Sequence, residues 1–402
     1  MGARADVAST GGNTVRSGER ALELAVTAAQ NVLSGRFGAA VRLAEPEDLG
    51  GSERSTVLRA KVAETPFTLP KTLVVKHYGP SAGATAAESF AREAVSYQLF
   101  TALSEDERMC PELFAHDAGE RVLVLEDLGH APTLADKLLG RDATAAERSL
   151  LTLARSLGRL HATTAGREAD FDALVRRIGT DCGPDPLARQ WQRAVRELPE
   201  VFTEALGIDL PQAGTTVPEQ VAWLLEGSKH RAFSPDDLCP DNNMITSKGA
   251  RFLDFEGGRV REVLLDAAYL RVPFPSCWCA FDLPRGMSEA MLAAWRAEVT
   301  GMWPEFADDE VLEPQLLDAQ LFWVQLSTWW FLPRGAERNA RIDEHLPSPK
   351  RAAALYARWQ RLAEDAERLE RYWLYDYASA VVDGLAARFE GELTLASYPA
   401  FR

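Results

Sequence analysis

The chain has 402 residues, of which 46% are hydrophobic and 26% are charged, and its net charge is −15. This composition is that of a globular protein, and the length allows two or three domains with a substantial core. The acidic excess disfavours a polyanionic partner such as nucleic acid. No apolar run is long enough to span a membrane and the N-terminus lacks the apolar core of a secretory signal, so we expect a cytoplasmic protein without membrane contacts.

The cysteines are odd in number and scattered along the chain, which argues against a disulfide framework. They are Cys110, Cys182, Cys239, Cys277 and Cys279. Cys277 and Cys279 are separated by one residue, and the sequence offers them neither a second cysteine pair nor a nearby histidine. We therefore expect buried or half-buried thiols at this pair in preference to a zinc site.

Residues 1–18 are mostly small or polar and carry no apolar periodicity, which predicts a flexible tail. From Glu19 to Leu33 apolar residues recur at helical spacing, and two glycines, Gly35 and Gly38, follow. We expect a packing helix here that contributes no chemistry.

Between residues 41 and 78 the apolar period becomes two, which predicts strands. A first strand surrounds Ala60 and a second spans residues 72–78. Gly51 and Ser52 belong to a turn before the first strand. Main-chain amides of this turn could approach a phosphate, or the glycines could form an ordinary hairpin turn.

Lys76 directly follows the apolar run 73–75, so its ammonium group is expected on a buried strand, where it needs a partner of opposite charge. A helix is expected over residues 84–103, and Glu93 falls on its inward-facing apolar stripe. A buried lysine and a buried glutamate are each costly alone, so we predict an ion pair between them. Glu88 is the alternative partner, and a second alternative is that Lys76 reaches solvent.

A further strand is predicted over residues 122–125, where it runs into Glu126. Thr144–Glu147 has the sequence of a capping box at the start of a helix. Its core stripe consists of Leu150, Leu153, Ala154, Leu157 and Leu160. His161 ends the stripe, and we interpret it as a structural residue in preference to a ligand. Two more helices are expected around 187–198 and 218–225.

Residues 233–258 hold the polar pattern with the clearest chemical meaning. Asn242 follows Asp237 by five places and opens a short strand over 243–246, and a second strand over 251–253 ends on Asp254. In such a hairpin the residue entering one strand lies across from the residue leaving the other, so Asn242 and Asp254 should lie side by side. An amide oxygen and a carboxylate suit Mg²⁺. Asp237 is then placed to accept a proton from an attacking hydroxyl.

After Asp254 the sequence predicts helices over residues 291–299, 312–331, 351–369 and 377–389. This part is rich in aromatic residues, and those in the irregular stretch 273–278 could line a pocket for a small organic molecule. At helical spacing we expect most of the tryptophans to be core residues, among them Trp323, Trp329 and Trp330.

These motifs resemble the aminoglycoside phosphotransferase and choline kinase family of small-molecule kinases. The family's loop reads His-Gly-Asp-Leu-His-Pro-Gly-Asn, and residues 235–242 read Pro-Asp-Asp-Leu-Cys-Pro-Asp-Asn, so four of the eight positions match. The family's Ile-Asp-Phe/Trp-Glu signature corresponds to Leu253–Glu256, and its Asp-Leu-Ala element is similar to Asp266–Ala268.

The resemblance implies an α+β, bilobal protein-kinase-like fold. Residues 19–127 would form a small N-lobe with an antiparallel sheet, and residues 128–402 a larger, mainly helical C-lobe that carries the hairpin and the substrate-binding helices. Backbone groups at about Glu126 and Leu128 would read adenine at the hinge. The alternative there is that Glu126 and Asp127 are only an exposed strand end.

By the same resemblance, Lys76 held by Glu93 would grip the phosphates of ATP, while Asn242 and Asp254 would hold Mg²⁺. Asp237 would orient and deprotonate the substrate. The implied activity is transfer of the γ-phosphate of ATP to a hydroxyl of a small molecule, such as an amino sugar, an aminoglycoside or a similar metabolite.

Two departures from the family loop keep a second hypothesis open. Pro235 stands where the family has a histidine and cannot supply its side-chain hydrogen bond, and Asp236 replaces a glycine and adds a charge beside Asp237. The alternative function is a nucleotide-binding pseudokinase or regulatory module that binds ATP without transferring phosphate.

Overall fold

The computed structural model describes residues 10–52, 54–79, 83–179, 182–208, 217–334, 349–389, 391 and 393–402. The chain divides into two compact units. The first consists of Met1–His130 and Asp172–Gly183, and the second of Ala131–Phe171 and Pro184–Arg402.

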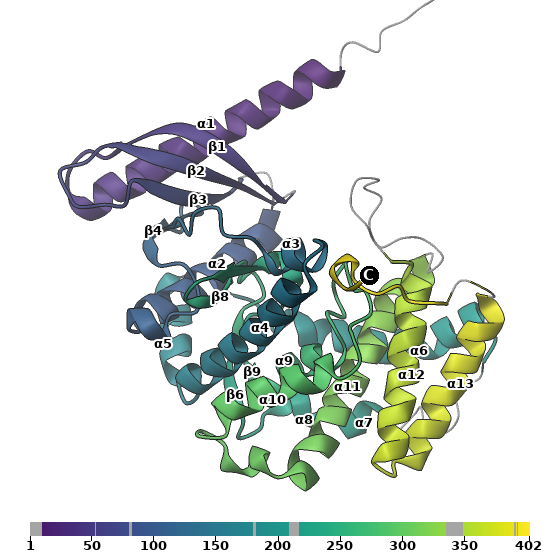
Figure 1. Cartoon of the computed structure of the whole chain (residues 1–402). Coiled ribbons are helices and arrows are strands. Elements are labelled where there is room, and N and C mark those ends of the chain that lie inside the picture. The colour runs from purple at the N-terminus through teal and green to yellow at the C-terminus, as the bar shows by residue number, and fades with distance from the viewer. Residues whose placement is uncertain are drawn as a thin grey trace, which may run out of the picture. The chain divides into compact units, whose positions relative to one another are not determined.

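A five-stranded antiparallel sheet with strand order β1-β2-β3-β5-β4 forms the centre of the first unit (Figure 1). The elements of this unit are α1 (Thr10–Phe37), β1 (Arg42–Ser52), β2 (Ser55–Glu64), β3 (Thr72–Tyr78), α2 (Gly83–Thr101), β4 (Leu113–Asp117) and β5 (Val122–Glu126). The strand predicted over residues 72–78 is confirmed as β3, and those around Ala60 and over 122–125 as β2 and β5.

The two faces of this sheet are covered by different helices. Val75 of β3 packs in a core cluster with Leu33 of α1, so α1 covers the face to which Val75 points. Because neighbouring side chains of a strand point to opposite faces, Lys76 points away from α1. The helix that meets Lys76 on that other face is α2, through Glu93.

α1 begins at Thr10, nine residues before the expected start at Glu19. The predicted tail is therefore wrong for residues 10–18, and residues 1–9 lie outside the described residues. A nucleated helix gains one hydrogen bond for each residue added, so a polar stretch can extend a helix that packs further along.

The second unit is mainly helical and carries two short antiparallel strand pairs, β6 with β9 and β7 with β8. Its elements are α3 (Leu134–Leu138), α4 (Ala143–Thr164), α6 (Pro186–Leu206), α7 (Val217–Val221), α8 (Trp223–Glu226), β6 (Arg231–Ser234), β7 (Asn243–Thr246), β8 (Gly249–Phe252), β9 (Arg259–Glu262), α9 (Val263–Arg271), α10 (Met287–Val299), α11 (Asp309–Phe331), α12 (Arg351–Arg368) and α13 (Tyr372–Arg388). α5 (Glu168–Ile178) belongs partly to each unit.

The predicted fold class is confirmed in its elements, because a small unit built on an antiparallel sheet accompanies a larger, mainly helical one that carries the hairpin. Among the residues that the structure describes, no helix is both long and apolar enough to cross a membrane.

α4 supplies the core of the second unit. Its predicted stripe is fully buried: Leu150, Leu153, Ala154, Leu157 and Leu160. The predicted capping box is wrong, because the side chain of Asp142 caps the helix by accepting a hydrogen bond of 2.9 Å from the Ala145 N–H. A carboxylate at this position satisfies an N-terminal amide and interacts well with the helix dipole.

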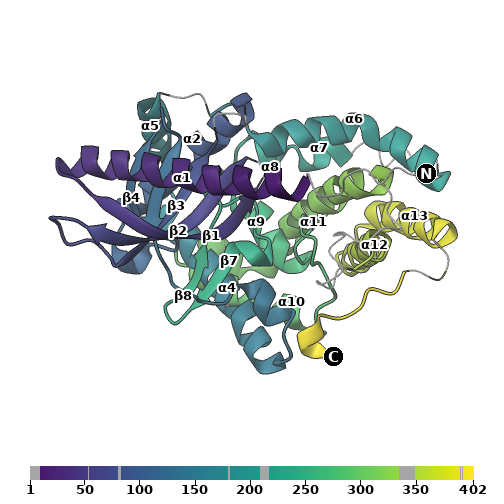
Figure 2. The same ribbon diagram turned by 90° about the horizontal axis from the view of Figure 1, so that it is seen from above.

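The C-terminal helices pack through aromatic residues. α12 and α13 lie side by side (Figures 1 and 2), with the rings of Trp359 and Tyr377 5.5 Å apart. Trp323 and Trp329 are buried, as expected. Trp330 is only half-buried, and its indole N–H donates to Oε1 of Gln190 at 2.9 Å.

Candidate functional site

Lys76 and Glu93 form the ion pair that the sequence predicts. Nζ of Lys76 lies 3.0 Å from Oε1 and 2.9 Å from Oε2 of Glu93, and the hydroxyl of Tyr78 donates to Oε2 as well. Lys76 is 7% exposed and Glu93 is 0% exposed. Each charge is therefore compensated mainly within the protein, because little of either side chain is exposed to water.

The alternative partner, Glu88, lies 3.6 Å from the guanidinium of Arg92 on its own helix. Glu93 is thus the residue that holds Lys76, and a role of this pair in phosphate binding stays a prediction.

The segment after β5 is tied to the sheet. Asp127 accepts two hydrogen bonds from the guanidinium of Arg59, at 2.8 Å and 3.1 Å, and its side chain is 6% exposed. Burial raises the pKa of Asp127, but the hydrogen bonds from Arg59, Thr72 and the Gly129 N–H, together with the charge of Arg59, outweigh it, so the pKa lies below its usual value. Asp127 is therefore not an exposed strand end.

The backbone N–H of Glu126 donates to the carbonyl oxygen of Glu112 at 2.8 Å. The N–H of Glu126 is therefore engaged within the first unit, whereas the sequence predicts an adenine contact by backbone groups at about Glu126 and Leu128. The contact itself stays a prediction.

Gly51 and Ser52 form the end of β1 and do not form a separate turn before β2, since they pair with Thr56 and Ser55. A Cβ atom on Gly51 would lie 2.2 Å from the carbonyl oxygen of Ser55, and φ of Gly51 is 139°. A glycine is therefore required here by the close approach of two strands, and phosphate binding by Gly51 and Ser52 stays a prediction.

The hairpin of the second unit has the predicted first strand, over Asn243–Thr246, and its second strand spans Gly249–Phe252 where 251–253 was predicted. Asn243 pairs with Phe252, and the N–H of Leu253 donates to the carbonyl oxygen of Asn242 at 2.9 Å. Asn242 therefore lies across from the residue that precedes Asp254. Asp254 adopts a left-handed backbone conformation with φ of 62°, a strained geometry that proteins keep mainly at functional positions.

Asp237 lies in the loop before the 3₁₀ turn Pro240–Asn242. Its Oδ1 accepts hydrogen bonds from the hydroxyl of Ser276 at 3.0 Å and from the N–H of Cys239 at 3.2 Å. Its Oδ2 lies 3.3 Å from the amide nitrogen of Asn242, which leaves the amide oxygen as the end that can bind a cation. The carboxylate is thus fixed by its neighbours in one orientation.

Burial raises the pKa of Asp237. The hydrogen bonds from Ser276 and Cys239 oppose this rise, and the charges of Asp241 and Asp254 add to it. A carboxylate with a raised pKa is a better proton acceptor, which suits a general base.

One pocket of about 270 Å³ in the second unit brings the predicted polar residues together. Asp237, Asn242 and Asp254 all border it. The other lining residues are Cys239, Asp241, Ser276, Cys277, Trp278, Phe331 and Arg351. The pocket combines three carboxylates with aromatic surface and one guanidinium, and a volume of this order admits only a small molecule or part of one.

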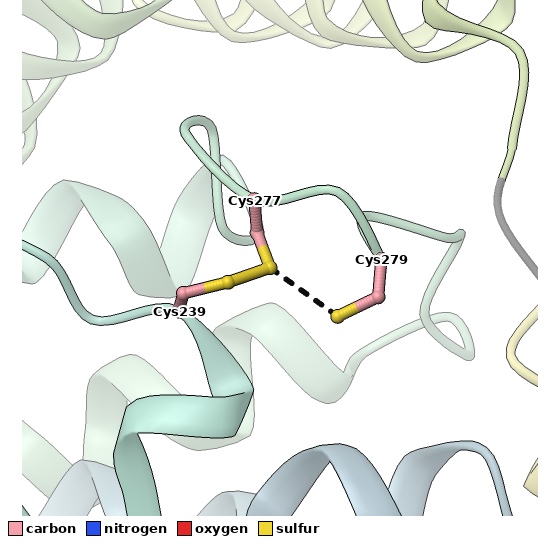
Figure 3. Close-up of side chains that lie close together, drawn as sticks. All are labelled: Cys239, Cys277 and Cys279. Carbon is pink, nitrogen blue, oxygen red and sulfur yellow. Dashed lines mark hydrogen bonds between the residues drawn. A yellow bond between two sulfur atoms is a disulfide. The ribbon is translucent and has the colours of Figure 1, made fainter. Parts of the chain in front are cut away.

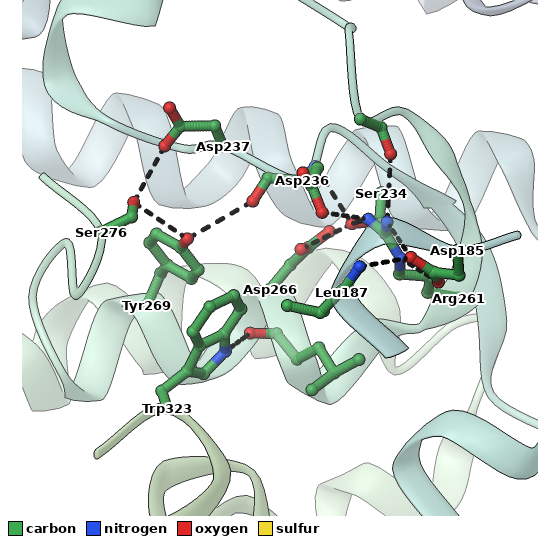
Figure 4. A network of polar contacts seen from close by, with 12 residues as sticks. Asp185, Leu187, Ser234, Asp236, Asp237, Arg261, Asp266, Tyr269, Ser276 and Trp323 are labelled. Atoms are coloured by element: carbon green, nitrogen blue, oxygen red, sulfur yellow. Dashed lines mark hydrogen bonds and ion pairs between the residues drawn. The ribbon is translucent and has the colours of Figure 1, made fainter. Parts of the chain in front are cut away.

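Arg261 anchors the loop that carries Asp237 (Figure 4). It is 3% exposed, lies 2.7 Å from Asp236 and makes two hydrogen bonds of 2.7 Å and 2.8 Å to Asp185. It also donates to the carbonyl oxygen of Gly257 at 3.1 Å. Burial raises the pKa of Asp236 to about 6 against the pull of Arg261, so its carboxylate is mostly ionised at pH 7.

A second buried network lies under the loop. The hydroxyl of Ser234 donates to Oδ1 of Asp266 at 2.8 Å, and Nε2 of His161 lies 3.1 Å from Oδ2. The indole N–H of Trp295 donates to Nδ1 of His161 at 3.0 Å, so the ring proton lies on Nε2 and is donated to Asp266. His161 is therefore a structural residue, as predicted.

Two of the cysteines do not carry the thiols expected from the sequence. Cys239 and Cys277 form a disulfide with their Cα atoms 5.3 Å apart, and Cys279 keeps a thiol. A pairing across 38 residues depends on how the loops meet in space, and the spacing of the cysteines carries no sign of it.

Three further residues at the site were also missed. Arg261, Asp185 and Ser276 join the site through contacts with residues far away in the sequence. Asp185 also caps α6 by accepting from the Leu187 N–H at 2.9 Å, but this local role does not indicate its contact with Arg261. For Arg261, one signal was available: Asp236, an added charge in a buried loop, requires a counter-charge somewhere.

The donor set fits a hard cation and a nucleotide. Asp237, Asn242 and Asp254, which carry oxygen ligands, line one pocket, and Mg²⁺ prefers one or two carboxylates with substrate phosphates and water as its other ligands. A buried lysine on a strand, held by a helix glutamate, is the partner that kinases use for phosphates.

No family model matches the chain, and no curated protein matches it. Among solved structures, it is similar to a choline kinase from Cryptosporidium parvum Iowa II (13% identity, TM-score 0.48, covering 84% of this chain and 93% of that one). It is also similar to a thermostable mutant of the aminoglycoside phosphotransferase APH(4)-Ia (13% identity, TM-score 0.46, covering 84% of this chain and 99% of that one). A third similar structure is the choline kinase LicA from Streptococcus pneumoniae (14% identity, TM-score 0.41, covering 83% of this chain and 96% of that one).

These are the two classes of protein that the motifs resemble. At such identities the likeness concerns only the course of the backbone, so we base the function on the residues of the site.

Proposed function

We propose that the protein is an ATP-dependent phosphotransferase that moves the γ-phosphate of ATP to a hydroxyl group of a small molecule, such as an amino sugar, an aminoglycoside or a similar metabolite. The observation that carries this proposal is the grouping of Asp237, Asn242 and Asp254 around one pocket, with Asp237 held by Ser276 and by the Cys239 N–H.

In this proposal Asp237 orients the acceptor hydroxyl and takes up its proton as the new bond to phosphorus forms. Its raised pKa and fixed orientation support that role. Asn242 and Asp254 hold Mg²⁺, which neutralises the charge of the phosphates when bound.

Lys76, fixed by Glu93, grips the phosphates. Gly51 and Ser52 approach them through the main chain, and the backbone at Glu126 and Leu128 reads the adenine. The proposal requires that the residues of both units act on one nucleotide. It assigns nucleotide binding to residues 19–127, and the chemistry and acceptor choice to 128–402.

We further propose that the acceptor enters the pocket lined by Trp278 and Phe331, since aromatic faces and carboxylates together suit a polar organic molecule. The net charge of −15 supports a partner that is not nucleic acid. We place the enzyme in the cytoplasm, where ATP is available, without membrane contacts.

The alternative is a pseudokinase that binds ATP without transfer, which the replacements at Pro235 and Asp236 favour. Against it stands Arg261, which pairs with Asp236 and braces the loop that Pro235 cannot brace. Loop support is therefore present, although it comes from a different residue.

The test measures ADP release with Mg²⁺ across a panel of amino sugars, aminoglycosides, choline-like alcohols and other hydroxylated metabolites, next to ATP affinity by calorimetry. Turnover is expected with at least one acceptor class. ATP binding without turnover on any acceptor would favour the pseudokinase, and a protein that does not bind Mg·ATP would refute both functions.

Two variants locate the chemistry. Asp237→Asn and Asp254→Asn should each lower the rate by about 10² to 10⁵-fold. Asparagine tolerates the left-handed backbone that Asp254 requires, so this change tests the carboxylate without adding strain. Turnover like that of the wild type in Asp254→Asn would contradict the site.

A further inference from the structure

Three sulfur atoms meet beside the proposed catalytic loop (Figure 3). Cys239 lies in that loop, between Asp237 and Asn242, and is disulfide-bonded to Cys277. Sγ of Cys279 lies 3.3 Å from Sγ of Cys277. The loop motif that this chain resembles has a histidine at the position of Cys239, so the function proposed above does not explain this cysteine.

The disulfide joins the two segments that hold Asp237. Oδ1 of Asp237 accepts one hydrogen bond from the N–H of Cys239 and another from the hydroxyl of Ser276, the residue before Cys277. Each donor thus lies at, or next to, one end of the disulfide. Breaking the S–S bond would remove the covalent link between the loop and the segment that carries Ser276, and would leave hydrogen bonds such as that from Ser276 to Asp237 to hold them together.

The disulfide is buried but borders a pocket. Cys239 is 5% and Cys277 4% exposed, and both line the pocket that also holds Asp237 and Asp254. Cys279 is fully buried and is not among the lining residues. The pocket is therefore the route by which we expect a small thiol reagent to approach the disulfide.

We propose that Cys239 and Cys277 form a redox-active site whose disulfide holds Asp237 in its working position and whose reduction by a small dithiol releases it. A thiol of the reductant attacks one sulfur, the Cys239–Cys277 bond breaks, and a mixed disulfide forms. The second thiol of the reductant then displaces the remaining cysteine. Two electrons and two protons pass to the protein, which gains two thiols, and the reductant leaves as a cyclic disulfide.

The rival is a metal centre of three thiolates, because the sulfur atoms of Cys239, Cys277 and Cys279 all lie within 4.8 Å of one another. The redox site and the metal centre differ in whether they require Cys279. The redox site needs only Cys239 and Cys277, whereas a thiolate centre needs all three sulfurs.

The first experiment is peptide mapping by mass spectrometry of the full-length protein, alkylated without reduction, after dithiothreitol, and after reoxidation with a small cyclic disulfide. The Cys239–Cys277 link should be present, lost and restored in turn. It should also persist in Cys279→Ser and be absent from Cys239→Ser and Cys277→Ser. Full alkylation of Cys239 and Cys277 in the reoxidised protein would overturn the proposal.

The same reduced protein is titrated with Co²⁺. A stoichiometric thiolate-to-cobalt absorption band in the wild type that disappears in Cys279→Ser would identify a metal centre and overturn the redox site. Absence of that band, with the disulfide restored, supports the redox site.

Trp278 reports on the position of the segment independently of activity. It lies between Cys277 and Cys279, and its indole N–H donates to Asp241 at 3.0 Å. Reduction should give a reversible fluorescence difference that is lost in Trp278→Phe and in Cys277→Ser. An unchanged spectrum on confirmed reduction would contradict the release of the segment.

The link to activity rests on the proposed function. Reduction should lower kcat by about tenfold, since misplacement of a catalytic group by about 1 Å can cost more than this. Reoxidation should restore it, in the wild type and in Cys279→Ser. If no acceptor is turned over, the mapping and fluorescence results still decide the redox site. Reversible reduction that leaves kcat unchanged would contradict the control of Asp237.

Discussion

Nη1 of Arg261 lies 2.7 Å from Oδ1 of Asp236, the residue immediately before the proposed catalytic base. Arg261 also binds Asp185, so one buried guanidinium compensates two carboxylates from different segments. This relationship explains how the chain tolerates an added charge in its catalytic loop.

Arg261→Met should lower the free energy of unfolding by about 3 kcal/mol, because it leaves two carboxylates in a poorly solvated place without their counter-charge. The value lies at the low end for a buried pair, since Asp236 and Asp185 keep partial solvent contact with side chains 26% and 23% exposed. Urea unfolding at pH 7 measures it.

Asp236→Asn is the matched control for this variant. Asparagine suits the left-handed φ of 77° at residue 236 and leaves Arg261 paired with Asp185. The loss of unfolding free energy should therefore be smaller than in Arg261→Met. In the double variant Arg261→Met with Asp236→Asn, the two losses of unfolding free energy should not add, and the coupling energy should be at least about 1 kcal/mol. Strict additivity would mean that the pair contributes nothing.

Gly257→Ala should destabilise the protein by about 1 to 3 kcal/mol, as overpacking does. A Cβ atom on Gly257 would lie 2.0 Å from Oδ2 and 2.7 Å from Cβ of Asp236, so the aspartate would have to move. Thermal unfolding of the variant and the wild type checks this.

Asp236→Gly removes the side chain that a Cβ on Gly257 would meet, and glycine suits the backbone at residue 236. In that background, Gly257→Ala should cost nothing further. An undiminished cost in the double variant would show that the close contact with Asp236 is not its cause.

Lys76→Met should cost about 3 to 5 kcal/mol, because it leaves Glu93 fully buried without its cation. The double variant Lys76→Met with Glu93→Leu should recover most of this loss, since apolar side chains of similar size replace a buried pair at little cost. Chemical denaturation of the three variants measures both effects.

Affinity for Mg·ATP separates stability from function in the same variants. If Lys76 grips phosphate, the double variant should bind ATP poorly although it is stable. Restored affinity in that variant would refute the phosphate role of Lys76 and leave the ion pair a purely structural feature.

Glu262 should make stability depend on pH. Its side chain is fully buried and caps α9 through the N–H of Leu264, and burial raises its pKa from 4.5 to about 7. The folded state therefore holds the proton more tightly than the unfolded state. The stabilisation, about 3 kcal/mol, is fully present below pH 4.5 and is lost as the pH rises through 7.

Glu262→Gln removes this titration. As the pH rises from about 4.5 to 7, the wild type should lose unfolding free energy relative to the variant. Above this range the difference between the two proteins should level off. Parallel profiles for the two proteins across this range would contradict the raised pKa of Glu262.

The local pattern of the sequence was sufficient for β3, the β7–β8 hairpin and the core stripe of α4. A period of two or of 3.6 is a property of neighbouring residues, and the chain cannot bury such a stripe in another secondary structure. The pair of Lys76 and Glu93 was predictable for a related reason, since two charges on apolar stripes need compensation and few partners were available.

The start of α1 was missed by nine residues and the cap of α4 by two, because helix ends depend on small differences in free energy between adjacent residues. Asp142 and Thr144 are both good capping residues by composition. The geometry of the turn before α4 selected the aspartate.

The sequence by itself therefore determined β3, the β7–β8 hairpin, the core stripe of α4 and the polar residues Asp237, Asn242 and Asp254, while the fold class followed from the resemblance of its motifs. Only the tertiary structure decided that Arg261 neutralises Asp236, that Ser276 holds Asp237, and that Cys239 is bonded to Cys277. These contacts join residues 25 to 39 positions apart, on segments brought together by packing around a common core. Periodicity extends only over a few turns or strand residues and carries no information at that separation.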